Sequence, residues 1–426
     1  MCRLESWINP ESDQMLVEGK ITGVDMAIKE IKKDVYWVGA VDWNISNFHG
    51  YSLARRGSTY NAFLVLDEKV TLFDLVPEKF KWDLYHQVHK LVAPDKIDYI
   101  VVNHVELDHS GALPFMVEKC SPERIFCSPM GEKSLLSHFH KPEWPVQVVK
   151  DGESISLGRK DVQFMEARML HWPDTMFSYI PQDRLLISSD AFGQNIATSR
   201  LFDDEHDLNL LLDESRHYYT NIILPFSGFV QKTLARVKES GLEIDMIAPD
   251  HGVIWRTHVA EIIGAYQEFS SQKVRAKAVL VYDTMWSSSE KMIKALGDAL
   301  VEEGIEIRLM SLKRFHHSDV MGEFSDAAAL VCASPTHNNG MLPLMADFLT
   351  YMKGLKPKGR LGATLGSFGW SGEAPKAMAQ VLEEAGFELP LEPLRVKNVP
   401  SHEHLAQCRE MGRVLAGKIR EKLSAQ

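Results

Sequence analysis

Imidazole and carboxylate side chains occur in four short segments, and each segment follows an apolar run typical of a strand. The segments are 103–109 (Asn-His-Val-Glu-Leu-Asp-His), 170–172 (Leu-His-Trp), 189–191 (Ser-Asp-Ala) and 250–252 (Asp-His-Gly). Strand ends in α/β proteins meet at one edge of a sheet, so we expect these segments to converge there. They predict a site for two metal ions, with one carboxylate to spare as a bridge. The predicted ligands are His104, Glu106, Asp108, His109, His171, Asp190 and His251.

The donor types restrict the metal. The set contains no thiolate, and the five cysteines, at positions 2, 120, 127, 332 and 408, are never spaced Cys-x-x-Cys. Imidazole and carboxylate suit non-haem iron, manganese or zinc, and an excess of carboxylate favours a redox-active iron pair over zinc. A single His-x-Glu-x-Asp-His motif could equally be a solvated turn. Four converging segments are harder to explain in that way.

The spacing inside the first segment suggests how its side chains point. His104, Glu106 and Asp108 would face one side if the chain stays extended after the strand. His109 would then come from the turn that leads into a helix expected to begin near Gly111. Four aromatic side chains could line the site or relay protons, with core packing as the alternative: Trp43, Trp172, Tyr218 and Tyr219.

A second, separate signal lies in three loops between predicted strands and helices. The first is rich in hydroxyls and has no lysine, and it opens a helix, which is where backbone N–H groups bind a phosphate. This suits a monophosphate end such as that of FMN, and Trp286, Phe368 and Trp370 are candidates to flank the flavin ring. The predicted FMN contacts are Thr284, Met285, Trp286, Ser287, Ser288, Ser289, Ser334, Pro335, Thr336, His337, Asn338, Asn339, Ser367, Phe368, Gly369, Trp370, Ser371 and Gly372.

The arrangement of elements predicts two domains of the α/β class. Residues 1–20 form a polar extension, residues 21–273 the metal-binding domain and residues 274–426 the flavin-binding domain. In the first domain, short strands come as meanders and then alternate with helices such as 81–92 and 111–119, which favours an α/β sandwich. In the second, strands alternate with helices at 289–303, 342–353, 373–385 and 402–423, which predicts a doubly wound parallel sheet.

Composition excludes several classes of partner. The chain of 426 residues has a formal net charge of −11, which argues against nucleic acid and anionic membrane surfaces. No stretch reaches the roughly 18 consecutive apolar residues of a membrane span, and the N-terminus lacks the apolar region of a signal peptide. We therefore expect a cytoplasmic protein.

The His-x-Glu-x-Asp-His motif with the later His171, Asp190 and His251 resembles the flavodiiron proteins. The segments Asn338-Asn-Gly340 and Gly369-Trp-Ser-Gly372 resemble the flavodoxin domain of the same family. The resemblance implies an N-terminal metallo-β-lactamase-like αββα sandwich and a C-terminal flavodoxin-like sheet. It assigns His104, Glu106 and His171 to one iron, Asp108, His109 and His251 to the other, and Asp190 to the bridge. In the hydrolytic branch of the superfamily a histidine usually stands where this chain has Glu106.

The resemblance also implies the activity. Members reduce O2 to water, NO to nitrous oxide, or both, and electrons reach the two irons through FMN. The chain matches the two-domain class without a fused rubredoxin, closest to the rubredoxin:oxygen oxidoreductases. This implies a separate rubredoxin or similar donor and a head-to-tail homodimer, or a dimer of dimers. A dizinc hydrolase fused to a flavodoxin-like electron-transfer or regulatory module is the alternative, and an inactive scaffold is a third possibility. The preference between O2 and NO stays open.

Overall fold

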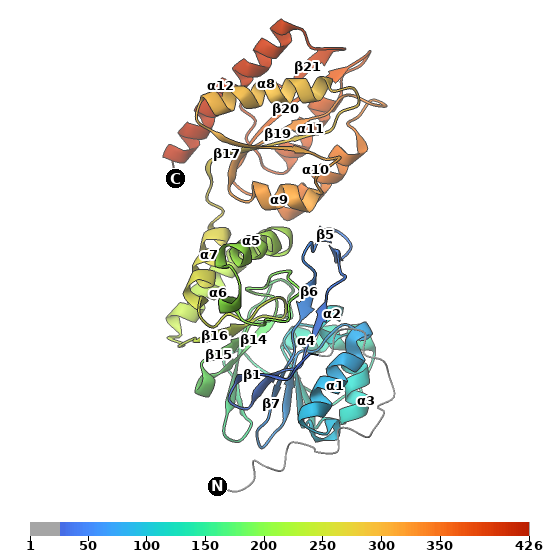
Figure 1. Cartoon of the computed structure of the whole chain (residues 1–426), viewed down its shortest axis with the longest axis vertical. Helices are drawn as coiled ribbons and strands as arrows, with labels where there is room; N and C mark the ends of the chain where they lie inside the picture. Colours follow the sequence, from blue (N-terminus) through green and yellow to red (C-terminus); the bar gives the residue numbers. More distant parts are fainter. Residues whose placement is uncertain (1–25, 426) are drawn as a thin grey trace. The chain divides into compact units, whose positions relative to one another are not determined.

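The computed structural model describes residues 26–425, so the predicted extension at 1–20 and Cys2 lie outside the described residues. The chain divides into two compact units, drawn in Figure 1. The N-terminal unit runs to Phe48 and also contains Ala54–Tyr218 and Gly228–Gln267. The C-terminal unit consists of the chain from Glu268 onward together with two short segments, His49–Leu53 and Tyr219–Ser227, which the sequence placed in the first domain.

The N-terminal unit is built on two sheets. The larger has the order β1-β2-β7-β8-β9-β10-β11 and the smaller the order β12-β13-β14-β15-β16. The strands of the larger sheet are β1 (Lys29–Lys32), β2 (Val35–Trp37), β7 (Phe63–Val65), β8 (Thr71–Phe73), β9 (Tyr99–Val102), β10 (Arg124–Cys127) and β11 (Val146–Val148). Those of the smaller are β12 (Ser154–Ser156), β13 (Asp161–Glu166), β14 (Met176–Ile180), β15 (Leu185–Ile187) and β16 (Met246–Ala248). Further short strands of this unit are β3 (Ala40–Asp42), β4 (Asn47–Phe48) and β6 (Ser58–Tyr60). The short strand β5 (Ser52–Leu53) lies in the segment that belongs to the C-terminal unit.

The core of this unit lies between the two sheets. Trp37, Phe63 and Phe126 of the larger sheet belong to the same buried cluster as Phe164 and Ile187 of the smaller one. Burial of such large apolar side chains is the main favourable contribution to folding. In Figure 1 helices α1 and α3 lie beside the larger sheet and α6 and α7 beside the smaller, so the layers run helix, sheet, sheet, helix. The predicted αββα sandwich is confirmed.

The helices of this part of the chain surround that core. They are α1 (Lys81–Leu91), α2 (Leu107–Ser110), α3 (Leu113–Cys120), α4 (Pro129–Phe139), α5 (Leu208–Tyr218), α6 (Ser227–Glu239) and α7 (Val259–Ser271). Shorter helical turns of this unit are η1 (Glu78–Phe80), η2 (Pro94–Lys96), η3 (Pro181–Asp183) and η4 (Asp203–Glu205). The π-helical η5 (Tyr219–Ile223) and the turn η6 (Leu224–Phe226) lie in the segment that belongs to the C-terminal unit. The helix predicted over 111–119 corresponds to α3, which begins two residues later, and the separate short helix α2 directly before it was not predicted.

The C-terminal unit is a parallel five-stranded sheet with the order β18-β17-β19-β20-β21. Its strands are β17 (Arg275–Tyr282), β18 (Glu306–Ser311), β19 (Ala327–Ala333), β20 (Leu361–Phe368) and β21 (Leu394–Lys397). Its helices are α8 (Ser288–Glu302), α9 (His317–Phe324), α10 (Pro343–Leu355), α11 (Ala374–Glu384) and α12 (His402–Ser424). Helices α8 and α12 cover one face of the sheet and α9 and α10 the other (Figure 1). All seven residues of β19 are buried, as expected for a central parallel strand. The predicted doubly wound sheet is confirmed.

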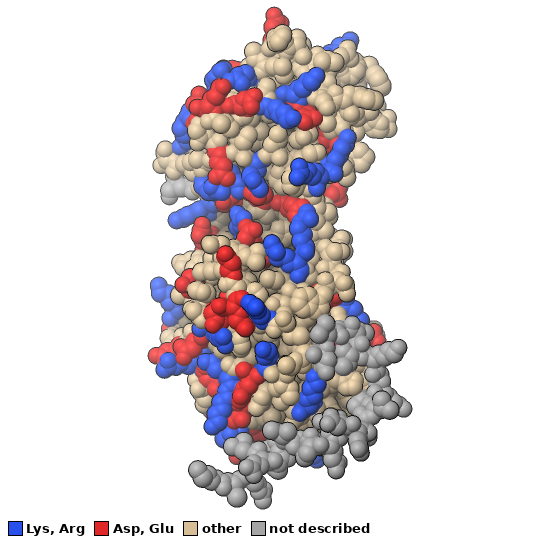
Figure 2. Space-filling view, in the orientation of Figure 1, with Lys and Arg blue, Asp and Glu red and all other residues tan. Residues whose placement is uncertain are grey.

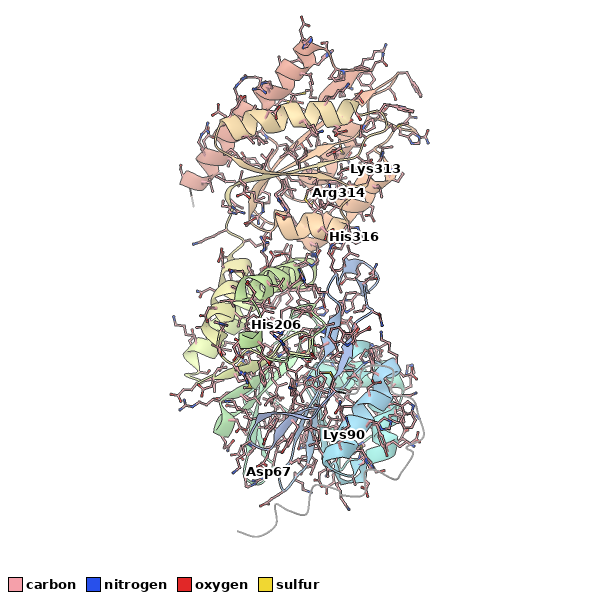
Figure 3. All side chains as sticks on the ribbon, in the orientation of Figure 1. Asp67, Lys90, His206, Lys313, Arg314 and His316 are labelled. Carbon is pink, nitrogen blue, oxygen red and sulfur yellow. The ribbon has the colours of Figure 1, made fainter. Side chains whose placement is uncertain are left out.

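Polar contacts link the turns of the N-terminal unit. Asp67, labelled in Figure 3, lies in the turn between β7 and β8 and accepts hydrogen bonds from the backbone N–H groups of Arg159 and Lys160. Those two residues form the turn between β12 and β13, so one carboxylate joins the two sheets. The backbone contacts and the Arg159 guanidinium lower the pKa of Asp67 even though burial raises it.

The surface carries charges of both signs. On the face shown in Figure 2, acidic and basic side chains are interspersed over the described residues. Among the helices of residues 26–425, none is long and apolar enough to cross a membrane.

Candidate metal centre and flavin pocket

The structure brings the four predicted segments of the N-terminal unit together at one edge of the sandwich. His104 follows β9 in the larger sheet, and His171 lies in the loop between β13 and β14. Asp190 and His251 each lie three residues beyond the ends of β15 and β16, which are paired in parallel with Ile187 opposite Ala248. The parallel register therefore carries these two side chains to the same edge, as the sequence predicted.

One part of the first segment differs from the prediction. The chain does not stay extended through 104–108, because Glu106 lies at the N-cap of α2, and Asp108 and His109 belong to that helix. The bend allows Glu106 and Asp108 to serve two different groups of side chains instead of facing one side together.

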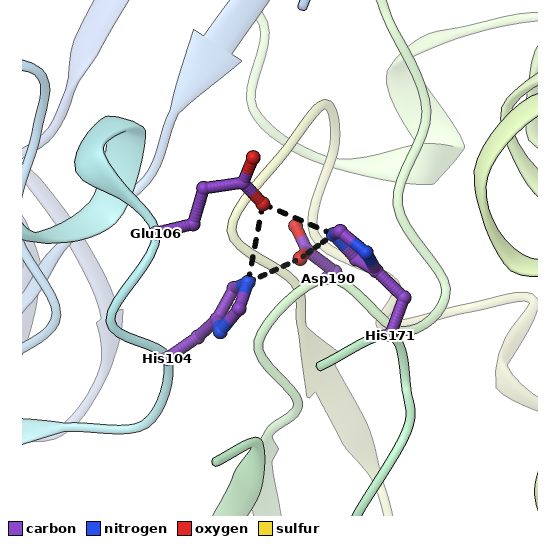
Figure 4. Close-up of side chains that lie close together, drawn as sticks. All are labelled: His104, Glu106, His171 and Asp190. Atoms are coloured by element: carbon purple, nitrogen blue, oxygen red, sulfur yellow. Dashed lines mark hydrogen bonds and ion pairs between the residues drawn. The ribbon is translucent and has the colours of Figure 1, made fainter. Parts of the chain in front are cut away.

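The first group consists of His104, Glu106, His171 and Asp190, whose donor atoms all lie within 4.8 Å of one another. Glu106 Oε2 lies 3.3 Å from His104 Nε2 and 3.1 Å from His171 Nε2. Asp190 Oδ2 lies 3.4 Å and 3.2 Å from the same two nitrogens. Figure 4 shows the four side chains pointing toward a common centre.

The second group consists of Asp108, His109 and His251. Asp108 lies 3.4 Å from His109 Nε2 and 3.3 Å from His251 Nε2, through different carboxylate oxygens. Asp190 contributes here too, because its Oδ1 lies 3.2 Å from His109 Nε2 and 3.3 Å from His251 Nε2. Asp190 thus directs one oxygen to each group, which is the arrangement that a bridging carboxylate needs.

Contacts with Thr59 fix the position of His251, the histidine of the segment 250–252. His251 Nδ1 lies 2.8 Å from the Thr59 carbonyl oxygen, and the Gly252 N–H donates to the Thr59 hydroxyl over 2.6 Å. Gly252 has φ +78°, and a Cβ there would lie 2.2 Å from Gln194 Oε1, so only glycine fits this close turn. Both contacts present Nε2 of His251 to the second group.

Aspartate and tyrosine side chains also contact two of the predicted ligands, His104 and Asp190. His104 Nδ1 lies 3.0 Å from Asp174 Oδ2, and that oxygen also accepts from the Val105 N–H over 2.7 Å. The Tyr218 hydroxyl donates to Asp190 Oδ1 over 2.9 Å. Of the four aromatic candidates, Tyr218 is therefore in direct contact with a predicted ligand, and Trp172 packs edge-on against the His104 ring at 5.1 Å between centroids. Trp43 is 46% exposed, and Tyr219 hydrogen-bonds Ser227 inside the C-terminal unit.

The electrostatics of the site favour positive charge at its centre. Burial by itself lowers the pKa of His251, but close contacts with the Asp108 and Asp190 carboxylates outweigh it and raise the pKa to about 9. Burial raises the pKa of Asp190, yet the facing histidines, His109 first among them, hold it well below its ordinary value. Anionic oxygens and imidazole nitrogens are thus concentrated in a buried volume.

The residues present fit a pair of metal ions. Nε2 of His109, Nε2 of His251 and Oδ2 of Asp190 are buried and make no hydrogen bond of normal geometry among the described residues. Buried polar atoms without partners are unfavourable, so an arrangement of several such atoms facing one another is explained by an ion between them. All seven predicted ligands lie in the two groups, His109 included.

The second predicted site is a cavity of about 580 Å³ in the C-terminal unit. The ends of β17, β19 and β20 provide its wall, as the three-loop pattern predicted. Fourteen predicted contacts line it: Thr284, Met285, Trp286, Ser288, Pro335, Thr336, His337, Asn338, Asn339, Ser367, Phe368, Gly369, Trp370 and Ser371. Trp286 is 87% exposed and Trp370 91% exposed, so both indoles lie at the rim of the cavity.

Four predicted contacts do not line the cavity: Ser287, Ser289, Ser334 and Gly372. Ser287 is the N-cap residue of α8, and Ser334 is buried and accepts from the Leu342 N–H. The buried Ser289 hydroxyl, in the first turn of α8, finds no hydrogen-bond partner among residues 26–425. A helix start with free N–H groups and an unused hydroxyl fits a phosphate group.

Several supporting residues were missed by the sequence analysis. Asn398 and Val399 line the flavin cavity from the loop after β21, a fourth strand end of the same sheet. Thr59 and Asp174 touch predicted ligands through their backbone or carboxylate. The loop after β21 could have been found only from the alternation of parallel strands and helices, which predicts a further strand end beside the cavity. No local sequence motif indicated that Thr59 or Asp174 would contact a ligand.

The first loop of the cavity is anchored by a lysine. Lys313, labelled in Figure 3, donates from Nζ to the Thr284 carbonyl oxygen, and the Thr284 N–H donates to Asp283 Oδ1 over 2.8 Å. These contacts hold the backbone that leads into α8.

Comparisons with known proteins agree with both halves. Residues 59–252 match the family model "ODP family beta lactamase" and residues 280–412 the model "Flavodoxin". A rubredoxin-oxygen oxidoreductase of Megalodesulfovibrio gigas is 46% identical over 402 residues, covering 94% of this chain and 100% of the relative. A nitric oxide reductase of Moorella thermoacetica is 45% identical over 391 residues, covering 91% and 98%.

Solved structures lead to the same family. The rubredoxin oxygen:oxidoreductase from Desulfovibrio gigas superposes with a TM-score of 0.92 at 46% identity, covering 93% of this chain and 100% of the other. The flavodiiron protein from Giardia intestinalis gives 0.90 at 31% identity, with 94% and 98% covered. Because the likeness extends over both units and nearly the full length of the relatives, the chain belongs to the flavodiiron protein family.

Proposed function

We propose that the protein is an oxidoreductase that reduces O2 to water, NO to nitrous oxide, or both, at two irons supplied with electrons through FMN. The observation that carries this proposal is the combination, in one chain, of a two-centre imidazole and carboxylate site with a flavin-sized cavity. The relatives named for oxygen and nitric oxide reduction support it. A hydrolase has no use for an attached flavin.

In this proposal the two groups of side chains hold one iron each. His104, Glu106 and His171 form position 1; Asp108, His109 and His251 form position 2. Asp190 joins them, since its two oxygens face the two groups. When bound, such a pair supplies two electrons and open coordination sites for a diatomic molecule. The protein supplies the donors, keeps them buried and holds Asp190 through the Tyr218 hydroxyl.

FMN is proposed to occupy the cavity of the C-terminal unit. The start of α8 would bind the phosphate, and the loops after β19 and β20 would surround the ring. FMN hydroquinone supplies two electrons, which with two from the irons make the four that O2 needs on its way to two water molecules; two NO molecules need only two.

The electron donor and the assembly remain proposals. A rubredoxin-type donor is supported by the name of the relative that is 46% identical. We infer a head-to-tail homodimer, in which the FMN of one subunit serves the metals of the other, and its test is described in the Discussion. The cytoplasmic location also stays a prediction.

The first test is the content of the purified protein. Material from iron-replete cells should contain two irons and one FMN per chain, because seven donors without thiolate suit an iron pair and the cavity suits one flavin. Metal analysis and release of the flavin measure both numbers. Steady-state consumption of O2 and of NO by the iron-loaded, pre-reduced protein then determines which gas it prefers.

A different composition would favour the alternative. Two zinc ions per chain, with hydrolase activity and no reduction of either gas, would identify a dizinc hydrolase with an electron-transfer or regulatory module. That outcome would contradict the proposed reductase.

A further inference from the structure

The two proposed metal positions have donors of the same composition. Each offers two imidazoles, one carboxylate of its own and one oxygen of Asp190. The donors themselves therefore give no reason for one position to differ from the other. Any difference must come from the groups that contact the ligands from behind, and in metal sites such groups alter metal affinity and electronic properties.

Position 1 has an anionic contact of this kind. Asp174 is 1% exposed, and its Oδ2 lies 3.0 Å from His104 Nδ1. The loop between β13 and β14 carries both His171 and Asp174, so it supplies one ligand and supports another. The loop is itself fixed, because the Ser128 hydroxyl donates to the Asp174 carbonyl oxygen over 2.6 Å.

Position 2 has only a longer carboxylate contact of this kind. His251 Nδ1 faces the Thr59 carbonyl oxygen at 2.8 Å, which is a neutral acceptor. His109 Nδ1 lies 3.4 Å from Asp250 Oδ2, but neither atom makes a hydrogen bond of normal geometry among the described residues. The shortest contact to the Nδ1 atom of a ligand histidine is thus made by a carboxylate in position 1 and by a neutral carbonyl group in position 2.

We propose that Asp174 is a positioning residue that makes the two metal positions unequal. It fixes the His104 ring with Nε2 toward position 1, and its negative charge makes that ring a stronger donor. Position 1 therefore binds its iron more tightly than position 2 and stabilises the ferric state more. The inference rests on the proposed diiron function and adds to it an order of metal binding and of oxidation.

Chelator competition against the ferrous holoprotein under argon tests this order. The wild-type protein should release its irons in two steps, with position 2 first. Asp174→Asn keeps the size of the side chain and an oxygen that can accept from the Val105 N–H, but it removes the charge. We expect it to weaken the tighter step roughly 10- to 100-fold and to leave the weaker step unchanged.

Asp250→Asn is the matched control. It makes the same chemical change at a fully buried aspartate next to a ligand histidine of the other position. The tighter step should be unchanged in this variant. FMN content and the unfolding midpoint of each variant report whether the fold is intact.

A second variant keeps the test informative if Asp174→Asn does not fold. Ser128→Ala retains the Asp174 charge but removes the hydrogen bond that fixes its loop. It should weaken the same, tighter step by a smaller factor.

The reduction potential gives a readout that loss of packing alone would not move. In Asp174→Asn the potential of the more tightly held iron should rise, because its ferric state is less stabilised. A tighter step and a potential that do not change, equal weakening of both steps, or an effect on the weaker step alone would each overturn the proposal. Release of both irons by the wild-type protein in a single step would overturn it too, because the two positions would then be equivalent. A purified protein that does not contain two irons per chain would instead contradict the diiron function itself.

Discussion

Replacing Asp190 with alanine should abolish reduction of both gases while FMN stays bound. Asp190 is 1% exposed and its two oxygens face the two donor groups at 3.2 to 3.4 Å. Without this carboxylate the charges of two cations in a buried site lose their shared counter-charge, and Coulomb interactions are strong there. The fall in turnover should exceed about a hundredfold, since groups that merely support ligands are already worth roughly 10- to 100-fold.

The measurement is turnover with O2 and with NO, together with iron and FMN content. Asp213→Ala is the matched control, because Asp213 is exposed and pairs only with the neighbouring Arg216 in the contacts described. That variant should match the wild type. Asp190→Asn, which keeps the volume but not the charge, should resemble Asp190→Ala. Two irons and normal rates in Asp190→Ala would show that Asp190 is not the bridge.

Two inactive variants should restore activity to each other if FMN and metals on different subunits work together. One parent carries His104→Ala and Glu106→Ala, which removes two donors of position 1. The other carries Ser288→Glu at the start of α8, where a carboxylate would repel the FMN phosphate while suiting the helix N-terminus. Each parent should be inactive. In a mixed head-to-tail dimer one junction still pairs an intact flavin with an intact metal site.

Random reassociation sets the expected size of this effect. About half of the dimers would be mixed and each would have one working junction of two, so about a quarter of wild-type activity should return. Mass measurement verifies the mixed dimers, and oxygen consumption with a chemical reductant gives the rate. Each parent dissociated and reassociated alone is the control. No recovery in verified mixed dimers would exclude transfer between subunits and leave the chemistry of each site untouched.

Residue types and local spacing were sufficient to predict which side chains the structure brings together, in the two donor groups and around the cavity of the C-terminal unit. The metal-binding segments were recognisable because, in each of them, imidazole or carboxylate side chains follow directly on an apolar run that predicts a strand. The flavin loops were recognisable because three of them follow successive parallel strands. What failed was local geometry, as at Glu106, where the chain turns into α2 instead of staying extended. Spacing alone does not reveal where a strand stops pairing.

Contacts between distant segments were not predictable in the same way. Asp174 lies three residues after the ligand His171 and Asp250 directly before the ligand His251, and nothing in the sequence tells which of these two buried aspartates lies closer to a ligand histidine. In the structure Asp174 lies 3.0 Å from His104 Nδ1, whereas Asp250 stays 3.4 Å from His109 Nδ1. Asn398 and Val399 were not predicted as part of the flavin cavity for a similar reason. They line it because β21 pairs with β20, and that pairing is a property of the folded sheet.

The sequence by itself therefore determined the kinds of chemistry present, the two α/β folds and the family. These depend on side-chain type, on hydrophobic periodicity and on motifs a few residues long. Only the tertiary structure decided that Asp190 offers one oxygen to each group and that Tyr218 and Asp174 support different ligands. Such contacts depend on the register and packing of segments that lie dozens of residues apart, and shifts of about an ångström make or break a hydrogen bond.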